Sequence, residues 1–332
     1  MNLSEHRRFC VAPMMAYTDR HFRYLLRLIS CHAMLYTEML SSHAILNGDR
    51  SCLLDFSDQE HPLALQIGGN CPEDMARCAE YAAQYGYDEI NINVGCPSPR
   101  VGKAQFGACL MKTPQRIVDC VRLMSQASDL PISVKCRIGV DDYDGYERFY
   151  RFIECVADAG CNTFIVHARK ALLGKLSHKQ NREIPPLEYE YVYRLKQERP
   201  DLEIILNGGI QNIDAAYQKL DIVDGVMLGR AVQKNPFILH EVDALFYNQH
   251  TDYKSPLDIA RMMLLYIEYQ ISKNTFNTKL LQAVQNLFKG HRHAKKWRHL
   301  LSVEANRIEK NKLVGWLDKQ LELFDRELLE NT

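Results

Sequence analysis

The sequence predicts a (β/α)8 barrel, the TIM-barrel fold of the α/β class, followed by a small all-helical domain. Eight short runs of β-branched and aliphatic residues alternate with stretches of helical spacing over roughly the first 230 residues. Several runs are continuously apolar, which is typical of parallel strands covered on both faces. A doubly wound sheet is the alternative, but no G-x-G-x-x-G segment follows the first run.

The elements follow one another in regular order. The predicted strands are Phe9–Pro13, Met34–Leu40, Leu63–Ile67, Glu89–Asn93, Ile132–Cys136, Thr163–His167, Glu203–Leu206 and Gly225–Leu228. The helices predicted between them include Glu73–Tyr85, Pro114–Ser125, Tyr146–Ala159, Leu187–Glu198 and Asn212–Leu220. Beyond Asn235 only helical patterns remain, at Pro236–Phe246, Pro256–Ser272, Thr278–Phe288 and Lys295–Phe324. The polar segment Asn248–Ser255 predicts the linker, so we expect a catalytic barrel over residues 1–247 and a helical domain over residues 248–332.

Composition narrows the class of protein. With 46% hydrophobic and 25% charged residues, the chain resembles an ordinary globular protein. Lys plus Arg and Asp plus Glu each number 41, so binding to a polyanion would need a local basic patch. The 11 cysteines include no C-x-x-C pair, which argues against a structural metal. No apolar run approaches the length of a membrane span. We expect a monomeric cytoplasmic protein without metal or membrane partners.

Polar or conformationally special residues follow nearly every predicted strand. In this fold the loops at the carboxyl ends of the strands build the active site. The residues there are Pro13, Met14, Glu38, Gln66, Asn93, Cys96, Lys135, His167, Asn207 to Gly209, Gly229 and Arg230. One such side chain is usually only solvated, but their convergence on one rim predicts a pocket. Glu38 stays ambiguous, since it could pair with Arg20 or Arg23 and orient the first loop.

The last two strands end in a pattern typical of a phosphate site. Asn207-Gly208-Gly209 and Gly229-Arg230 would let backbone N–H groups approach a phosphate, and Arg230 would add a charged contact. The alternative is that these glycines only make tight turns. Lys135 and His167 would face the head group of such a ligand. There a cation could stabilise an anionic reduced flavin, and a Schiff-base lysine is the competing use of Lys135.

Cys96 lies on the sharpest local feature, the turn Asn93-Val94-Gly95-Cys96-Pro97. Most cysteines are inert, but this one is presented on a loop at a strand end. A thiol with an ordinary pKa of about 8.5 is mostly protonated at neutral pH. It can therefore deliver a proton to a carbanion-like carbon without prior activation. The position suits a general acid better than a metal ligand.

The helical tail carries a basic segment between Asn286 and Lys312. Its cations are Lys289, Arg292, Lys295, Lys296, Arg298, Arg307, Lys310 and Lys312, with only Glu304 and Glu309 opposing them. Trp297 lies among them and could stack on a base. The alternative is an ordinary solvated helix. Next to a barrel with a phosphate site we favour RNA.

Taken together, the motifs resemble a known family. They are Ala12 to Met14, Leu35 to Met39, Gln66 to Gly69, Asn91 to Pro97, Phe106 to Met111, Lys135, His167 to Lys170, Asn181 to Leu187 and Asn207 to Gly209. The chain resembles the tRNA-dihydrouridine synthases of the A type over essentially its whole length. The resemblance implies an FMN-dependent enzyme that uses NADPH to reduce uridines 20 and 20a of the tRNA D-loop to 5,6-dihydrouridine. Reduced FMN would pass a hydride to C6, and the target base would be flipped out of its loop.

The resemblance also assigns residues. Cys96 matches the catalytic proton donor to C5. The flavin-binding positions match Pro13, Met14, Met15, Gln66, Lys135, His167, Asn207, Gly208, Gly209, Gly229 and Arg230. The positions that touch tRNA match Asn93, Lys179, Arg182, Lys295 and Arg298. Two departures, Ala16-Tyr17 for the usual Asp-Trp and Pro99 for a commoner Asp, lie in loops near the flavin and the base.

Three rival functions stay open at this point. A flavin barrel acting on a small pyrimidine would need no basic tail. A non-catalytic RNA-binding barrel would not need Lys135, His167 and Cys96 together. A Schiff-base aldolase would form a borohydride-trappable adduct on Lys135.

Overall fold

The computed structural model describes residues 1–98, 102, 105–177, 179–249, 252, 254–275 and 278–329. The parallel sheet consists of β1 (Phe9–Val11), β2 (Leu35–Tyr36), β3 (Leu40–Ser41), β4 (Leu63–Gly68), β5 (Glu89–Val94), β6 (Ile132–Arg137), β7 (Thr163–His167), β8 (Glu203–Asn207) and β9 (Gly225–Leu228). The order along the sheet is β1-β9-β8-β7-β6-β5-β4-β2, with β3 paired to β4. A parallel bridge between Cys10 and Met34 joins the two ends. The prediction of a (β/α)8 barrel is confirmed.

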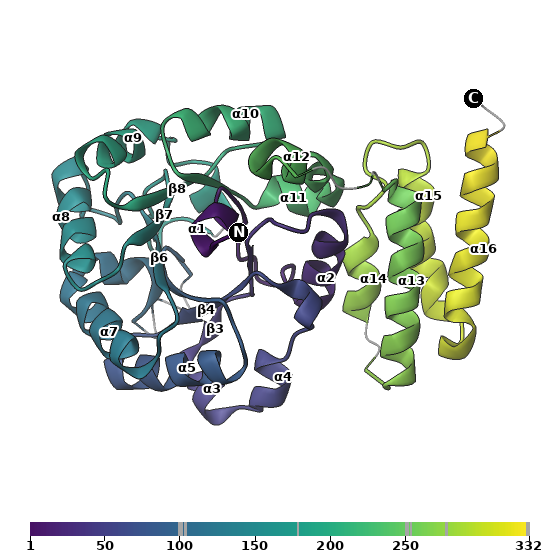
Figure 1. The fold of residues 1–332 in the computed structure, drawn as a ribbon, viewed down its shortest axis with the longest axis horizontal. Helices are drawn as coiled ribbons and strands as arrows, with labels where there is room; N and C mark the ends of the chain where they lie inside the picture. Colours follow the sequence, from purple (N-terminus) through teal and green to yellow (C-terminus); the bar gives the residue numbers. More distant parts are fainter. Residues whose placement is uncertain are drawn as a thin grey trace.

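The helices cover the outside of the barrel (Figure 1). They are α2 (Arg20–Ile29), α3 (Ser42–Asn47), α4 (Arg50–Leu54), α5 (Pro72–Gln84), α7 (Pro114–Ala127), α8 (Tyr146–Ala157), α9 (Tyr189–Glu198), α10 (Ile213–Tyr217), α11 (Arg230–Lys234) and α12 (Val242–Tyr247). Short 3-10 turns η1 (Asp58–Glu60), η2 (Gly107–Lys112), η3 (Gln180–Arg182), η4 (Gln218–Asp221) and η5 (Pro236–Glu241) join several of them. The short helix α1 (Leu3–His6) lies over the centre of the barrel in Figure 1. On α8 the buried residues Phe149, Phe152, Ile153 and Val156 recur at helical spacing, so one face packs on the sheet.

The second predicted strand, Met34–Leu40, is wrong as a single element, because the chain divides into β2 and β3. Thr37 lies between them, and its hydroxyl Oγ1 accepts a hydrogen bond from the N–H of Gln66 at 3.0 Å. The same hydroxyl donates to the carbonyl of Glu38 at 2.9 Å. A side chain thus replaces a main-chain acceptor of the ladder, and regular pairing stops for three residues.

Part of the barrel interior is polar. A chain of hydrogen-bonded side chains, which we call the polar column, consists of Arg7, Glu89, Ser133, Asn91, Gln66 and Asn93. Arg7 donates to Glu89 and to Glu203, both at 2.7 Å. From there successive side-chain bonds lead to Asn93, which lies at the carboxyl end of β5. The column joins the amino end of the barrel to the end where the loops follow the strands.

The helical tail consists of α13 (Pro256–Ser272), α14 (Thr278–Val284), α15 (Ala294–His299), the π-helical turn η6 (Leu300–Glu304), the 3-10 turn η7 (Ala305–Arg307) and α16 (Lys310–Leu329). The predicted single helix Lys295–Phe324 is wrong, because the chain becomes extended at Ile308. Its first half contacts α14 and its second half contacts α13, which one straight helix could not do. No helix in the described part of the chain is long and apolar enough to cross a membrane.

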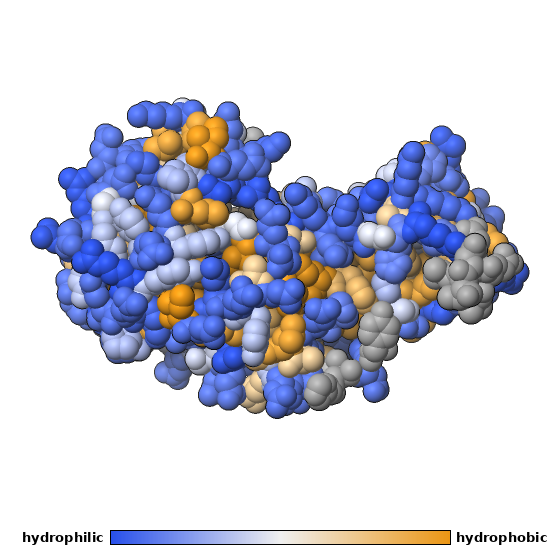
Figure 2. Space-filling model, turned by 90° about the horizontal axis from the view of Figure 1, so that it is seen from above, coloured by the Kyte–Doolittle hydropathy of each residue, from blue (hydrophilic) through white to orange (hydrophobic). Residues whose placement is uncertain are grey.

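The tail packs against α2 of the barrel. The ring of Tyr24 stacks on Tyr266 of α13 with a centroid distance of 3.9 Å. Nδ1 of His21 lies 2.9 Å from the hydroxyl of the same tyrosine. In the space-filling view, the outline is hollowed between barrel and tail, and the rim of the hollow is mainly hydrophilic (Figure 2).

Candidate active site

The strand ends and their loops surround a pocket of about 720 Å³. This volume lies within the range of about 300–1,000 Å³ that is usual for ligand pockets. The predicted residues that line it are Pro13, Met14, Met15, Gln66, Asn93, Cys96, Lys135, His167, Arg182, Asn207, Gly208, Gly209, Gly229 and Arg230. Lys179, Lys295 and Arg298 lie elsewhere on the surface, the first two exposed and the third half-buried.

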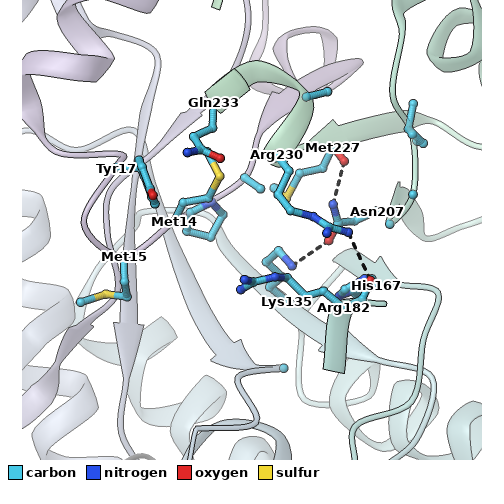
Figure 3. Close-up of a pocket in the computed structure, with 18 of the residues that line it drawn as sticks. Met14, Met15, Tyr17, Lys135, His167, Arg182, Asn207, Met227, Arg230 and Gln233 are labelled. Carbon is cyan, nitrogen blue, oxygen red and sulfur yellow. Dashed lines mark hydrogen bonds between the residues drawn. The ribbon is translucent and has the colours of Figure 1, made fainter. Parts of the chain in front are cut away.

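The pocket is strongly cationic. Five Lys and Arg side chains line it, namely Lys135, Arg137, Arg182, Arg230 and Lys234. Within the described part of the lining there is no Asp or Glu. Figure 3 shows several of the basic side chains opposite Met14, Met15 and Tyr17. Such a site favours an anionic ligand with an apolar or aromatic part.

Lys135 and Asn207 form a fixed pair on the pocket wall (Figure 3). The ammonium Nζ donates to Oδ1 of Asn207 at 3.1 Å, and Nδ2 of Asn207 donates to the carbonyl of Met227 at 2.7 Å. Burial, together with the neighbouring charge of Arg137, lowers the pKa of Lys135 to about 8. An anion bound nearby would keep this lysine charged, so the group can respond to the charge of a ligand.

His167 and the paired glycines share one corner of the pocket. Burial and the neighbouring cations Arg137 and Lys135 hold the pKa of His167 well below its usual range, so its ring is neutral. Gly208 and Gly209 have φ of 117° and 73°. A Cβ on Gly208 would lie 2.6 Å from Cδ2 of His167. The glycines therefore make left-handed turns, as the alternative supposed, and they also leave space that a side chain would fill.

The Cys96 turn is held from two sides. Oδ1 of Asn93 accepts from the N–H groups of Gly95 and Cys96 at 3.2 and 2.9 Å. Nδ2 of Asn93 donates to Gln66 at 2.9 Å, which ties the turn to the polar column. Burial raises the pKa of the half-buried Cys96 thiol. The group that the sequence assigns to proton donation thus stays protonated at neutral pH.

Arg137 is a site residue that the sequence analysis missed. Its guanidinium donates to the carbonyls of Gly95, Asn181 and Lys170 at 2.9, 3.0 and 3.1 Å. The side chain is only 3% exposed, and burial lowers its pKa to about 10. It lies two residues beyond Lys135 on β6, and period-two spacing places both on one face of the strand. That spacing is the signal that could have found it.

The phosphate corner contains polar atoms without protein partners. Arg230 pairs with Glu183 at 2.9 Å and donates to the carbonyl of Arg182 at 3.2 Å. Within the described chain, Nε of Arg182 and Oδ1 of Asn235 are buried without a hydrogen-bond partner. Buried polar atoms usually have one, so a ligand that supplies both a donor and an acceptor fits here.

Glu38 orients the first loop, but not through the arginines considered above. Its carboxylate accepts from the N–H of Ala16, which has a left-handed φ of 64°. Arg20 pairs with Asp55, and Arg23 pairs with Glu60 at 2.7 Å, so the pairing expected for Glu38 is wrong. Pro99, the second departure from the family pattern, lies outside the described residues.

The expectation of an exposed aromatic in the basic tail is wrong. Trp297 is 1% exposed, and its Nε1 donates to the carbonyl of Val284 at 2.9 Å. Its ring packs against Phe288 and Phe324. Lys295 and Lys296 stay exposed around it, so the basic surface exists without a stacking platform. No cluster of three or more His, Cys, Asp or Glu suited to a metal occurs among the described side chains.

Comparison with solved structures supports the barrel architecture. The chain of morphinone reductase in complex with tetrahydroNAD superposes with a TM-score of 0.50 at 11% identity, over 76% of this chain and 90% of that one. Fold and pocket thus define a barrel enzyme with an anion-binding site at the carboxyl ends of its strands. The family model "Dihydrouridine synthase (Dus)" matches residues 10–322.

Relatives narrow this class. A protein of Synechocystis named tRNA-dihydrouridine(20/20a) synthase is 49% identical over 88% of this chain and 87% of its own length. A protein of the same name from Escherichia coli is 46% identical over 90% and 87%. The chain belongs to the dihydrouridine synthase family.

Proposed function

We propose that the protein reduces uridine to 5,6-dihydrouridine in the D-loop of tRNA, at positions 20 and 20a, with FMN as cofactor and NADPH as reductant. Membership of the dihydrouridine synthase family supports the reaction, and the shared name of the relatives supports the substrate positions. The observation that carries the proposal is one cationic pocket lined by both Lys135 and the protonated thiol of Cys96.

The pocket fits FMN by the chemistry of its lining. Gly208, Gly209, Gly229 and Arg230 would hold the phosphate, and Lys135 would face the flavin ring. Arg182 has a buried Nε without a protein acceptor, which suits an anionic or carbonyl-bearing ligand. When bound, FMN supplies the hydride that adds to C6 of the uracil ring.

Cys96 would complete the reduction by giving its Sγ proton to C5. The double bond then gains one hydride and one proton, and a thiolate is left on the protein. Arg137 and Lys135 lower the energy of that thiolate, since their charges act against the effect of burial on the pKa. Asn93 and Arg137 keep the thiol in place by fixing the backbone on both sides of Gly95.

The target base would leave its stack to reach this pocket. Asn93 and Arg182 line the pocket and would contact the uridine, whereas Lys179, Lys295 and Arg298 would contact phosphates outside it. We accordingly assign chemistry to the barrel, residues 1–247, and tRNA positioning to residues 248–332.

Two measurements test the proposal. The purified protein should carry flavin absorbance after incubation with FMN, and it should form dihydrouridine at positions 20 and 20a of a tRNA transcript with NADPH. Equal activity on free uracil or dihydroorotate would favour a small-pyrimidine enzyme. Borohydride trapping of a carbonyl substrate on Lys135 would favour an aldolase.

Cys96→Ala tests the proton donor. The variant should bind FMN and oxidise NADPH, but tRNA should reoxidise the reduced flavin about 10²–10⁴ times more slowly. Cys109→Ala is the control, because Cys109 is also half-buried but does not line the pocket. An unchanged rate of reoxidation in Cys96→Ala would assign the proton to another group.

A further inference from the structure

A second, smaller cavity of about 160 Å³ lies beside the first. Tyr17 and Gln233 line both cavities, so the two adjoin. We propose that this cavity seats the base of the nucleotide next to the target uridine and selects that base. The inference rests on the proposed function and adds to it a specificity site for the flanking nucleotide.

The walls of the cavity come from both parts of the chain. Tyr17 belongs to the loop before α2, Gln233 to α11, Gln282 to α14, and Gln285 and Asn286 to the turn after α14. Nδ2 of Asn286 donates to the carbonyl of Gln233 at 3.0 Å, so the turn of the tail is fixed to the barrel at this point. A ligand in the cavity would contact barrel and tail at once.

The chemistry of the walls suits the edge of a nucleobase. Gln282, Gln285 and Asn286 are amides, each with both donor and acceptor atoms. Single-stranded RNA is read by hydrogen bonds to the edges of unstacked bases and by stacking on aromatic rings. Lys279 adds a cation for a phosphate, and the volume is far too small for a whole cofactor.

Tyr17 supplies an aromatic surface at the boundary between the cavities. The side chain is 41% exposed, and Figure 3 shows it at the edge of the larger pocket, on the same side as Met14 and Met15. Its position is fixed through Ala16, whose N–H is bound by Glu38. A flipped uridine on one side of Tyr17 would leave the adjoining nucleotide at the opening of the smaller cavity.

The competing occupant is the adenosine half of the nicotinamide cofactor. That group carries several phosphates, whereas Lys279 is the single Lys or Arg among the described residues of this lining, and Asp19 adds a carboxylate. A nucleotide within a tRNA loop brings a single phosphate with each base. The charge balance therefore favours the RNA base.

The experiment uses tRNA transcripts that contain one target uridine and each of the four bases at its neighbouring positions. Dihydrouridine formation is followed at limiting tRNA with the wild type and with Gln282→Ala/Gln285→Ala. The wild type should prefer one flanking base by about tenfold, the effect of about one well-placed hydrogen bond. The double variant should lose the preference and keep its rate of NADPH oxidation.

Controls separate specificity from folding. Gln282 is exposed on a helix, where Ala is tolerated better than Gln, so the fold should persist. Gln282→Glu keeps the size but removes the donor, and it should change which base is preferred. Gln218→Ala, at an exposed site on the barrel, should behave as wild type.

Each outcome has one meaning. Equal rates of the wild type on all transcripts, or an unchanged preference in both Gln282 variants, would overturn this inference and leave the proposed function intact. A raised KM for NADPH with an unchanged base preference would assign the cavity to the dinucleotide instead. No dihydrouridine from the wild type on any transcript would overturn the proposed function itself.

Discussion

Replacing Arg137 with Met should loosen two loops of the active site at once. The guanidinium makes three hydrogen bonds of 2.9–3.1 Å, to the carbonyls of Gly95, Lys170 and Asn181. Gly95 precedes Cys96, the proposed proton donor, and Asn181 precedes Arg182. Met fills a similar volume but donates no hydrogen bond, so the variant isolates the polar contribution.

The magnitude follows from two opposing effects. Hydrogen bonds from a charged group contribute about 1.5–3 kcal/mol each, which gives about 4.5–9 kcal/mol for three. Removing a buried cation also removes its desolvation cost of several kcal/mol. We therefore expect the free energy of unfolding to fall by about 2–4 kcal/mol, as measured by urea unfolding. Arg199→Met, which breaks a surface pair with Asp201, should cost at most about 1 kcal/mol.

The same variant should slow catalysis. A displacement of about 1 Å can cost about 10²-fold in rate, so stopped-flow reoxidation of the reduced flavin by tRNA should slow by about 10- to 100-fold. Arg137→Lys should not rescue it, because one ammonium group does not reproduce the spread of donors on a guanidinium. If Arg137→Met unfolded and reoxidised like Arg199→Met, the contacts of Arg137 would not be what holds these loops.

Three further predictions concern the flavin corner and the tail. FMN affinity should fall as pH rises through about 8, because the anion favours protonated Lys135, whose pKa is lowered to about 8; Lys135→Met should bind more weakly, with a flatter dependence in fluorescence titrations from pH 7 to 10. Gly208→Ala should lose about 1–3 kcal/mol of unfolding free energy and weaken FMN binding, since φ is 117° and the methyl group would meet His167; Gly315→Ala, at an open helical site, should be slightly stabilising, and equal effects would contradict the steric argument. Lys295→Ala/Arg298→Ala should flatten the plot of log tRNA affinity against log salt by about 0.7–0.9 for each phosphate that the protein no longer binds, whereas Arg122→Ala on α7 should not; equal slopes would place the RNA surface elsewhere.

The barrel was predictable because its strands are local and apolar. Runs such as Thr163–His167 and Gly225–Leu228 coincide with β7 and β9, since buried parallel strands need no partner-specific pattern. The break between β2 and β3 was not predictable, because it depends on the hydroxyl of Thr37 meeting an N–H on a neighbouring strand. The interruption at Ile308 likewise reflects which helix each half of the segment packs against.

The site could be predicted as a set of strand-end residues, but not as a network. The pocket lining includes every residue that the sequence assigned to the flavin, because strand ends converge by geometry alone. Arg137 escaped because its partners are backbone carbonyls of three distant segments, which leave no pattern in the sequence. Trp297 was misread because charged neighbours suggested exposure, whereas a short helix can bury one side chain among exposed lysines.

The polar column has a consequence for how this barrel can change. Each of its side chains is both donor to one neighbour and acceptor from another, or is charged, so a single apolar replacement strands a buried group on each side of it. The interior is thus strongly epistatic, and laboratory evolution toward new substrates should accept changes at Gln66 or Asn91 only in matched combinations. Loop residues such as Tyr17 carry no such constraint, so new specificities should arise first at the rim of this barrel.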